Sequence, residues 1–223
     1  MPHLILALPI LLFSVIVHEV AHGWVALRCG DPTARDAGRL TLNPLPHIEL
    51  FSTILLPALC LISRLGFFIA SARPVPVNPQ LLRGGERDHL KVTLAGPFSN
   101  FLLALAAALL ALLAAALNRE ADSATLAAGI VLLNSAVAIN LILFNFNLLP
   151  LPPLDGSWVL FHFLPAAWKG GFLRLQRHGF LLLIALLALS SSLGGGFDVF
   201  DVLFYPSQKL MLAFGILQRR LLS

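Results

Sequence analysis

The sequence predicts an all-α polytopic membrane protein: a bundle of about five to six transmembrane helices with a re-entrant segment and a short β-hairpin. The first observation is composition, because 58% of the 223 residues are hydrophobic and only 12% are charged, whereas soluble domains carry roughly 25% charged residues. The second is that apolar runs of the length needed to cross a bilayer recur along the chain. Because no long polar stretch separates these runs, we expect a single membrane-embedded domain over residues 1–223.

The first apolar run, residues 4–27, is predicted to be a retained transmembrane helix and not a signal peptide, because it is long and no basic residue precedes it. It contains the motif His18-Glu19-Val20-Ala21-His22. Two histidines at this spacing lie on one face of a helix and can bind one zinc ion, while the glutamate stays off the metal and acts on water. A charged side chain in a membrane helix costs about 2.5–3.5 kcal/mol, so the motif indicates a metal site in preference to two packed core histidines.

Residues 28–93 are predicted to connect the first two full helices. Polar and apolar residues alternate over 38–42, which predicts a short strand that either pairs with an extended substrate or belongs to a plain connecting hairpin. Residues 51–70 are apolar but interrupted by proline, arginine and glycine, which fits either a spanning helix or a re-entrant hairpin. The helix directions argued below favour a re-entrant segment, or a pair of partial spans, over a single crossing. The prolines of residues 72–79 favour an extended backbone.

Apolar runs in the rest of the chain predict four more helices, at residues 94–117, 126–149, 180–193 and 199–217. The second of these is followed by Pro150-Leu151-Pro152-Pro153-Leu154-Asp155-Gly156. Because the prolines end the helix, we expect Asp155 on irregular backbone at the membrane edge. Residues 157–177 are predicted to form a loop.

The direction of the helices follows if Asp155 joins His18 and His22 as a ligand. The helices 4–27 and 126–149 then run the same way, the helix between them runs opposite, and the chain from 28 to 93 begins and ends on one side. Loops on that side hold thirteen basic residues, eight in 28–93, three in 157–177 and two in the tail, against one on the other side. The positive-inside rule therefore places these loops in the cytoplasm, the N-terminus outside and the metal site nearer the cytoplasmic face of the cell membrane.

The same charge distribution explains the net charge of +4 without a nucleic-acid partner. Neither Cys29 nor Cys60 belongs to a Cys-x-x-Cys pair, so a cysteine zinc site or a disulfide framework is not supported. The histidines in loops or at interfaces are expected to face solvent and not to bind metal; these are His47, His89, His162 and His178.

Two motifs together carry a family resemblance. His18-Glu19-x-x-His22 and Asn147-x-x-Pro150-x-Pro152-x-Leu154-Asp155-Gly156 resemble the intramembrane site-2 zinc metalloproteases. Gly96-Pro97-x-x-Asn100 and Gly38-x-Leu40-Thr41-x-Asn43-Pro44 resemble that family as well. The likeness covers about residues 4–164 and looks closest to the small members, which lack an inserted peptide-binding domain or an appended regulatory one.

The resemblance implies that His18, His22 and Asp155 bind one zinc ion per chain and that Glu19 is the catalytic base. It implies further that Asn147 contacts substrate or the oxyanion and that Asn100 supports the site. The implied activity is zinc-dependent endopeptidase cleavage of transmembrane segments in membrane protein substrates, with a catalytic core over 4–164 and accessory helices over 178–217. In small members of the family, Asp-Pro usually follows the residue that matches His47, whereas Ile48-Glu49 follow it here. This departure affects the expected shape of the re-entrant segment and leaves the expected metal site unchanged.

Plainer interpretations exist for three of these residues. Asp155 suits a turn before Gly156, Asn147 suits the free carbonyls at a helix end, and Asn100 suits an interhelical hydrogen bond. For the whole chain the alternative is a non-proteolytic zinc-binding membrane protein or a metal transporter. A transporter needs ligands along a path across the membrane, whereas the ionisable groups here form one cluster; a protein that only holds zinc has no use for Glu19. The oligomeric state is left open.

Overall fold

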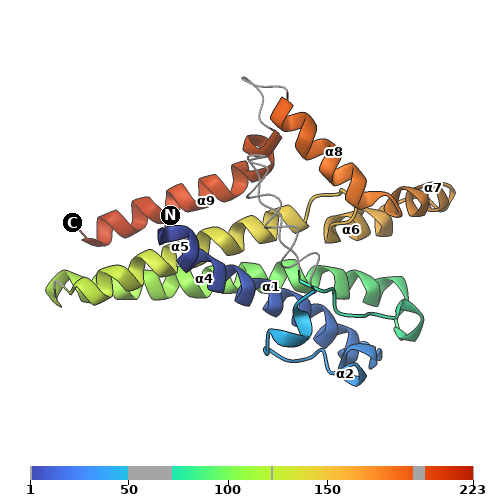
Figure 1. Ribbon diagram of the computed structural model, residues 1–223, viewed down its shortest axis with the longest axis horizontal. Coiled ribbons are helices and arrows are strands. Elements are labelled where there is room, and N and C mark those ends of the chain that lie inside the picture. Colours follow the sequence, from blue (N-terminus) through green and yellow to red (C-terminus); the bar gives the residue numbers. More distant parts are fainter. Residues whose placement is uncertain (1, 50–71, 122, 193–198, 223) are drawn as a thin grey trace.

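The structure is a computed structural model that describes residues 2–49, 72–121, 123–192 and 199–222. The regular secondary structure of the described residues is helical, with no β-strand among them (Figure 1). The α-helices are α1 (Pro2–Arg28), α2 (Thr33–Asp36), α4 (Glu86–Ala121), α5 (Ala124–Asn147), α6 (Asp155–Phe163), α7 (Ala166–Gln176), α8 (Gly179–Ser192) and α9 (Val199–Leu222). Two short 3-10 helices, η1 (Leu45–His47) and η3 (Pro79–Leu81), lie in the connection between α2 and α4.

Three helical segments within the described residues are long and apolar enough to cross a membrane: Ala7–Arg28, Glu86–Arg119 and Ala124–Asn147. The predicted class, an all-helical multi-pass membrane protein, is confirmed at this level. The larger number of five to six spans stays a prediction, since α8 has 14 residues and spanning takes about 20.

The three spanning candidates alternate in direction. Figure 1 shows that α1 and α5 run the same way and that α4 runs opposite to both. The Arg83 backbone N–H donates to the Cys29 carbonyl at 3.0 Å, so the chain returns to the end of α1 before α4 begins. This agrees with the expectation that residues 28–93 begin and end on one side. The expected re-entrant segment, residues 51–70, lies outside the described residues.

The long helix α4 has small residues inside and large ones outside. Its alanines pack against α5 and α9 in a core that holds Ala104, Ala107, Val137 and Leu141. Its leucines point away from the bundle, and between 47% and 59% of their surface is exposed at Leu102, Leu105, Leu109, Leu113 and Leu117. Small residues allow helix backbones to approach closely, while exposed leucines suit lipid. This distribution supports the assignment of α4 as a membrane span.

The strand predicted over residues 38–42 is wrong for the described structure, where these residues form turns and bends. Gly38 has a φ of +64°, which reverses the chain after α2, and Arg39 N–H donates back to Ala34 at 2.9 Å. Further on, the Thr41 hydroxyl accepts from Asn43 N–H at 3.1 Å. Such local hydrogen bonds compete with the extended pairing that a strand requires.

The loop predicted over residues 157–177 is also wrong, because this stretch forms α6 and α7. Its lysine and arginines suggested a solvated connection, but aromatic side chains join the two helices. The Phe161 ring of α6 lies 5.5 Å from that of Trp158 and 5.7 Å from that of Phe172 in α7. Asp155 is accordingly the first residue of a helix and does not lie on irregular backbone.

Residues 72–78, which we call the proline segment, are held in place by backbone bonds to buried polar side chains and to one loop carbonyl. Arg73 N–H donates to the His47 carbonyl at 2.8 Å, and Arg39 Nη2 donates to the Arg73 carbonyl at 2.6 Å. Asn78 N–H donates to Asp31 Oδ2 at 2.6 Å. The proline segment is therefore fixed at both ends against the loop that follows α1.

His47 is fully buried, which corrects the expectation that it faces solvent. Its Nε2–H donates to the Thr41 carbonyl at 2.9 Å. Because its backbone carbonyl also accepts the Arg73 N–H, His47 is part of the packing beneath the proline segment. It lies outside the group of residues that could hold a metal.

Candidate metal centre

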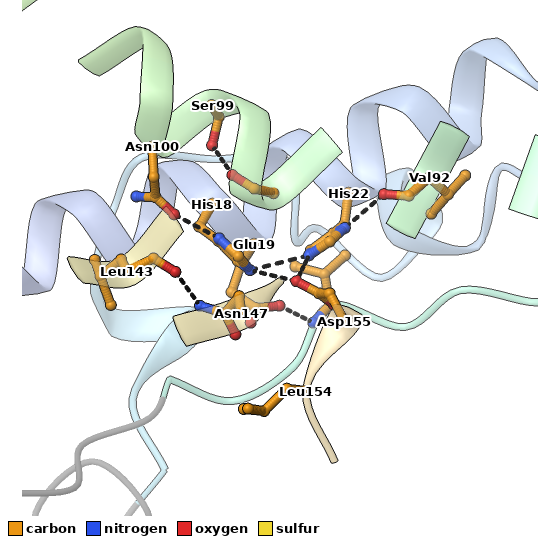
Figure 2. A network of polar contacts seen from close by, with 12 residues as sticks. His18, Glu19, His22, Val92, Ser99, Asn100, Leu143, Asn147, Leu154 and Asp155 are labelled. Carbon is orange, nitrogen blue, oxygen red and sulfur yellow. Dashed lines mark hydrogen bonds and ion pairs between the residues drawn. The ribbon is translucent and has the colours of Figure 1, made fainter. Parts of the chain in front are cut away.

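Three side chains from two helices converge inside the bundle (Figure 2). His18 and His22 come from α1, and Asp155 comes from the first turn of α6. The two Nε2 atoms lie 3.1 Å apart. Asp155 Oδ2 lies 3.1 Å from His18 Nε2 and 3.3 Å from His22 Nε2. The sequence had placed the two histidines together by helical spacing, and the fold brings Asp155 to them from more than 130 residues away.

A chain of amides determines which nitrogen of His18 carries the proton. Asn140 Nδ2 donates to the Ala136 carbonyl at 2.9 Å, so its oxygen faces Asn100 and accepts from Asn100 Nδ2 at 3.0 Å. Asn100 Nδ2 also donates to the Ser14 carbonyl at 3.2 Å. The Asn100 oxygen is then left for His18 Nδ1, at 2.6 Å. An amide oxygen only accepts, so His18 carries its proton on Nδ1.

The backbone of α4 does the same for His22. Its Nδ1 lies 2.7 Å from the Val92 carbonyl oxygen, which can only accept, so Nδ1 is again the protonated nitrogen. In the neutral form of each ring, Nε2 therefore presents a bare lone pair toward the other imidazole and toward the Asp155 carboxylate. Asp155 Oδ2 is itself buried without a hydrogen-bond donor.

Two neutral imidazole nitrogens and a carboxylate oxygen are all acceptors, and such a set fits a cation. Ligand atoms about 2.0–2.1 Å from a tetrahedral zinc ion lie roughly 3.3–3.4 Å apart, close to the 3.1–3.3 Å found between these three atoms. Two imidazoles and a carboxylate are also a donor set that zinc accepts. Imidazole ligands that donate their outer N–H to a carbonyl or amide oxygen are the usual arrangement around a protein metal.

Gly96 explains how α4 reaches the histidine pair. A Cβ atom at this position would lie 2.6 Å from His18 Nε2 and would also clash with the His22 ring. The glycine therefore lets the α4 backbone pass directly over the two imidazoles. This gives the Gly96-Pro97 pair a physical reason that the sequence motif alone does not show.

Gly156 allows the turn that delivers Asp155. A Cβ at Gly156 would clash with the carbonyl oxygens of Leu148 and Leu149, so glycine is needed where the start of α6 packs on the end of α5. The next residue, Ser157, is fully buried, and its hydroxyl donates to the Leu154 carbonyl at 2.6 Å. Asp155 is thus held by close backbone packing on one side and a hydrogen-bonded turn on the other.

Glu19 lies beside the cluster but bonds elsewhere. Its Oε2 accepts the backbone N–H of Val75 at 2.8 Å. Val75 stands between two prolines, Pro74 and Pro76, which have no N–H, so it supplies the one donor at this point of the proline segment. Arg39 brings a buried positive charge near Glu19. Burial and the nearby charge of Arg73 lower the pKa of the Arg39 guanidinium, whereas the negative charge of Glu19 raises it.

A cavity of about 160 Å³ adjoins the cluster, and its walls include His18, Glu19 and Asn147. Asn147 Nδ2 donates to the Leu143 carbonyl at 2.9 Å, which agrees with the plainer interpretation that this side chain satisfies a carbonyl near the helix end. Its position on the cavity wall is also what contact with a substrate requires. The structure therefore leaves both interpretations of Asn147 standing.

Sequence reasoning missed three partners of the site. Asn140 was one of four asparagines on its helix, and only knowledge of which helices are neighbours would have singled it out. The Val92 carbonyl and the Val75 N–H belong to the backbone, which every residue has, so no side-chain pattern marks them. Asn100, in contrast, was expected to support the site.

Comparisons with known proteins agree with this arrangement, and the chain belongs to the site-2 family of zinc metalloproteases. It is 36% identical to the protein named "Putative zinc metalloprotease YwhC" of Bacillus subtilis over 186 residues, which are 83% of this chain and 80% of that protein. It is 32% identical to "Putative zinc metalloprotease Rip2" of Mycolicibacterium smegmatis, over 79% of this chain and 64% of that protein. The Rip2 protein of Mycobacterium tuberculosis is 32% identical over 83% of this chain and 67% of its own length. No protein-family model and no solved structure matches the chain.

Proposed function

We propose that this protein is a zinc-dependent intramembrane endopeptidase that cleaves transmembrane segments of membrane proteins. The observation that carries the proposal is the cluster of His18, His22 and Asp155, in which three bare acceptors meet at the spacing of zinc ligands. Both histidines lie within the candidate span Ala7–Arg28. Membership in a zinc metalloprotease family supports the same activity.

In this proposal His18 Nε2, His22 Nε2 and an Asp155 oxygen hold one zinc ion per chain. When bound with an open position, zinc polarises a carbonyl and lowers the pKa of a water molecule to about 7. The amide chain through Asn100 and the Val92 carbonyl keep both imidazoles in the tautomer that can bind. Binding thus requires no change of tautomer at either neutral histidine.

Glu19 is the proposed general base. It follows His18 directly and lines the same cavity, and Val75 N–H engages one of its oxygens, which leaves the other for a water molecule. Glu19 removes a proton from the attacking water and then passes it to the amine that leaves. A positioned base of this kind typically contributes about 10²–10⁴ in rate.

Asn147 is the proposed donor to the oxyanion that forms on the substrate carbonyl. An amide NH₂ has two N–H groups, and one of them bonds to Leu143. The second can donate to a substrate oxygen in the cavity, which is the type of contact that stabilises a developing negative charge.

The substrate in this proposal is a membrane-spanning segment that enters from the bilayer and unwinds. A cavity of about 160 Å³ admits an extended chain and not a helix about 10 Å across. In this proposal the loops on the site's side lie in the cytoplasm and the N-terminus lies outside, as the positive-inside rule favours. The partners are therefore membrane proteins and lipid.

Glu19→Gln tests the function. The amide keeps the shape of the side chain and an oxygen for Val75 N–H, but it cannot take up the proton. We expect zinc content equal to that of the unaltered protein, and cleavage of a helix-destabilised single-span peptide in detergent reduced at least 10²-fold. Equal cleavage by both forms would contradict the mechanism. Absence of cleavage by the unaltered protein would favour a zinc-binding protein or a metal transporter.

A further inference from the structure

A second, larger cavity lies next to the metal centre and has no part in holding the metal. Its volume is about 600 Å³, and it is lined by the proline segment, the start of α4 and one face of α6. We call it the α6 pocket. Among described residues it shares no wall with the cavity around Glu19. Ligand-binding cavities commonly fall in the range of about 300–1,000 Å³.

Two walls of the α6 pocket connect it directly to the site. Val75 is part of the pocket lining, and its backbone N–H donates to Glu19 at 2.8 Å. Trp158 also lines the pocket and follows Asp155 by about one helical turn on the same face of α6. That separation is about 5 Å along the helix, whereas an extended chain advances about 3.3 Å per residue. A side chain within about two residues of a carbonyl at the metal centre therefore reaches the pocket.

The walls select for an uncharged occupant. The lining includes Val75, Val77, Trp158 and Phe161, and the His89 ring lies edge-on against Trp158 with 5.2 Å between the ring centroids. The one carboxylate in the described lining, Glu86, is bound by Lys169 at 2.6 Å. The same Lys169 nitrogen lies 4.9 Å from the centre of the Phe161 ring, so the charges at the rim compensate each other.

We propose that the α6 pocket is a specificity pocket that binds a large apolar or aromatic side chain of the substrate, within two residues of the bond that is cleaved. This rests on the proposed function and adds the substrate preference of that site. Insertion of the side chain anchors an unwound segment alongside the proline segment and places the neighbouring carbonyl near Glu19. Burial of a large apolar side chain in place of a small one typically changes kcat/KM by 10-fold or more.

The test uses a synthetic single-span peptide of leucine and alanine with a central Gly-Asn pair. Mass spectrometry of the products identifies the cleaved bond, and each of the three positions on either side of it is then varied through Ala, Leu, Phe and Asp. At one of these positions we expect kcat/KM to be at least 10-fold higher for Leu or Phe than for Ala, and lowest for Asp.

Three variants connect that preference to the pocket. Val77→Phe narrows the pocket and should reduce the advantage of Leu or Phe over Ala to within twofold. Phe161→Ala enlarges it and should shift the preference toward Trp, which is added to the peptide series for this variant. Phe163→Ala is the matched control, since Phe163 is on the same helix but 72% exposed and outside the lining, and should keep the original profile. Equal zinc content shows that each variant is folded.

A second measurement does not depend on cleavage. A benzophenone side chain at the selective position of the peptide should crosslink, in zinc-loaded Glu19→Gln protein, to α6 residues such as Phe161. Crosslinks to the walls of the smaller cavity, for example Phe146, would overturn the pocket assignment. Cleavage without any dependence on side-chain size, or an unchanged preference in Val77→Phe, would also overturn it while leaving the proposed function intact. Cleavage of no peptide by the unaltered protein would instead overturn the function on which this proposal rests.

Discussion

The two sides of the site are built in different ways. On the metal side, α1, α4 and α5 fix the histidines through side-chain amides and a helix carbonyl. On the base side, the proline segment fixes Glu19 through a backbone N–H, and that segment is tied down by Asp31, Arg39 and the His47 carbonyl. The difference teaches that the metal side can be altered through side chains, whereas the base side has to be altered through the backbone.

The largest expected effect of changing a supporting residue is on the metal side. Asn100→Ala removes the acceptor that holds His18 Nδ1–H and leaves Asn140 without its partner. Loss of such an outer hydrogen bond typically lowers metal affinity about 10–100-fold. Competition with a zinc chelator measures this in detergent. The matched control is Asn134→Ala, since Asn134 is on the same helix as Asn140 but bonds to Gln218, away from the site. Unchanged zinc affinity in Asn100→Ala would contradict the role of the amide chain.

The base side should respond to loss of one backbone proton. Val75→Pro removes the N–H that donates to Glu19. Val75→Ala also removes the valine side chain but keeps this N–H, so the two variants differ in the backbone donor. We expect kcat for an alanine-containing peptide to be about tenfold lower in the proline variant than in the alanine variant, because a neutral backbone hydrogen bond to a charged group contributes about 1.5–3 kcal/mol. Zinc content should be equal in both. Equal kcat would show that Glu19 is positioned without the proline segment.

Parts of this arrangement were predictable from local patterns and parts were not. The three spanning candidates follow from runs of apolar residues, and the pairing of His18 with His22 follows from helical spacing, because both are properties of one continuous segment. The helices over 157–177 were missed because the basic residues of this stretch suggested a solvent-exposed loop. The contacts that stabilise the two helices, such as Phe161 of α6 on Phe172 of α7, depend on how the helices pack and do not show in the sequence. The strand over 38–42 was wrongly expected because alternation ignores the positive φ of Gly38.

The smallest effect on activity is expected at Asp31, which binds the Asn78 end of the proline segment and does not contact Glu19 itself. Burial alone would raise the pKa of the Asp31 carboxyl. Hydrogen bonds from Thr33 and Asn78 lower this pKa by more than burial raises it, so the pKa lies below the usual value. A lowered folded-state pKa stabilises the protein above the unfolded value of about 3.9, and this contribution is lost as pH falls through the folded-state pKa. Asp31→Asn should therefore lower the unfolding temperature at pH 7, and less so below about pH 4, with zinc content unchanged.

For Asp31→Asn, thermal unfolding in detergent at the two pH values is the measurement. The gap between the two proteins should narrow at the lower pH, since the unaltered carboxyl then begins to lose its advantage. A gap that stays constant from pH 7 to below pH 4 would show that the ionised form of Asp31 is not what holds the proline segment.

X-ray absorption at the zinc edge of the purified protein tests the central claim most directly, because it reports the atoms around the metal. We predict one zinc per chain with two imidazole nitrogens at about 2.0–2.1 Å and oxygen ligands at about 2.0–2.2 Å. In His22→Ala we predict loss of the metal or of one imidazole from its shell. A sulfur neighbour at about 2.3 Å, or an unchanged zinc spectrum in His22→Ala, would contradict a centre formed by His18, His22 and Asp155.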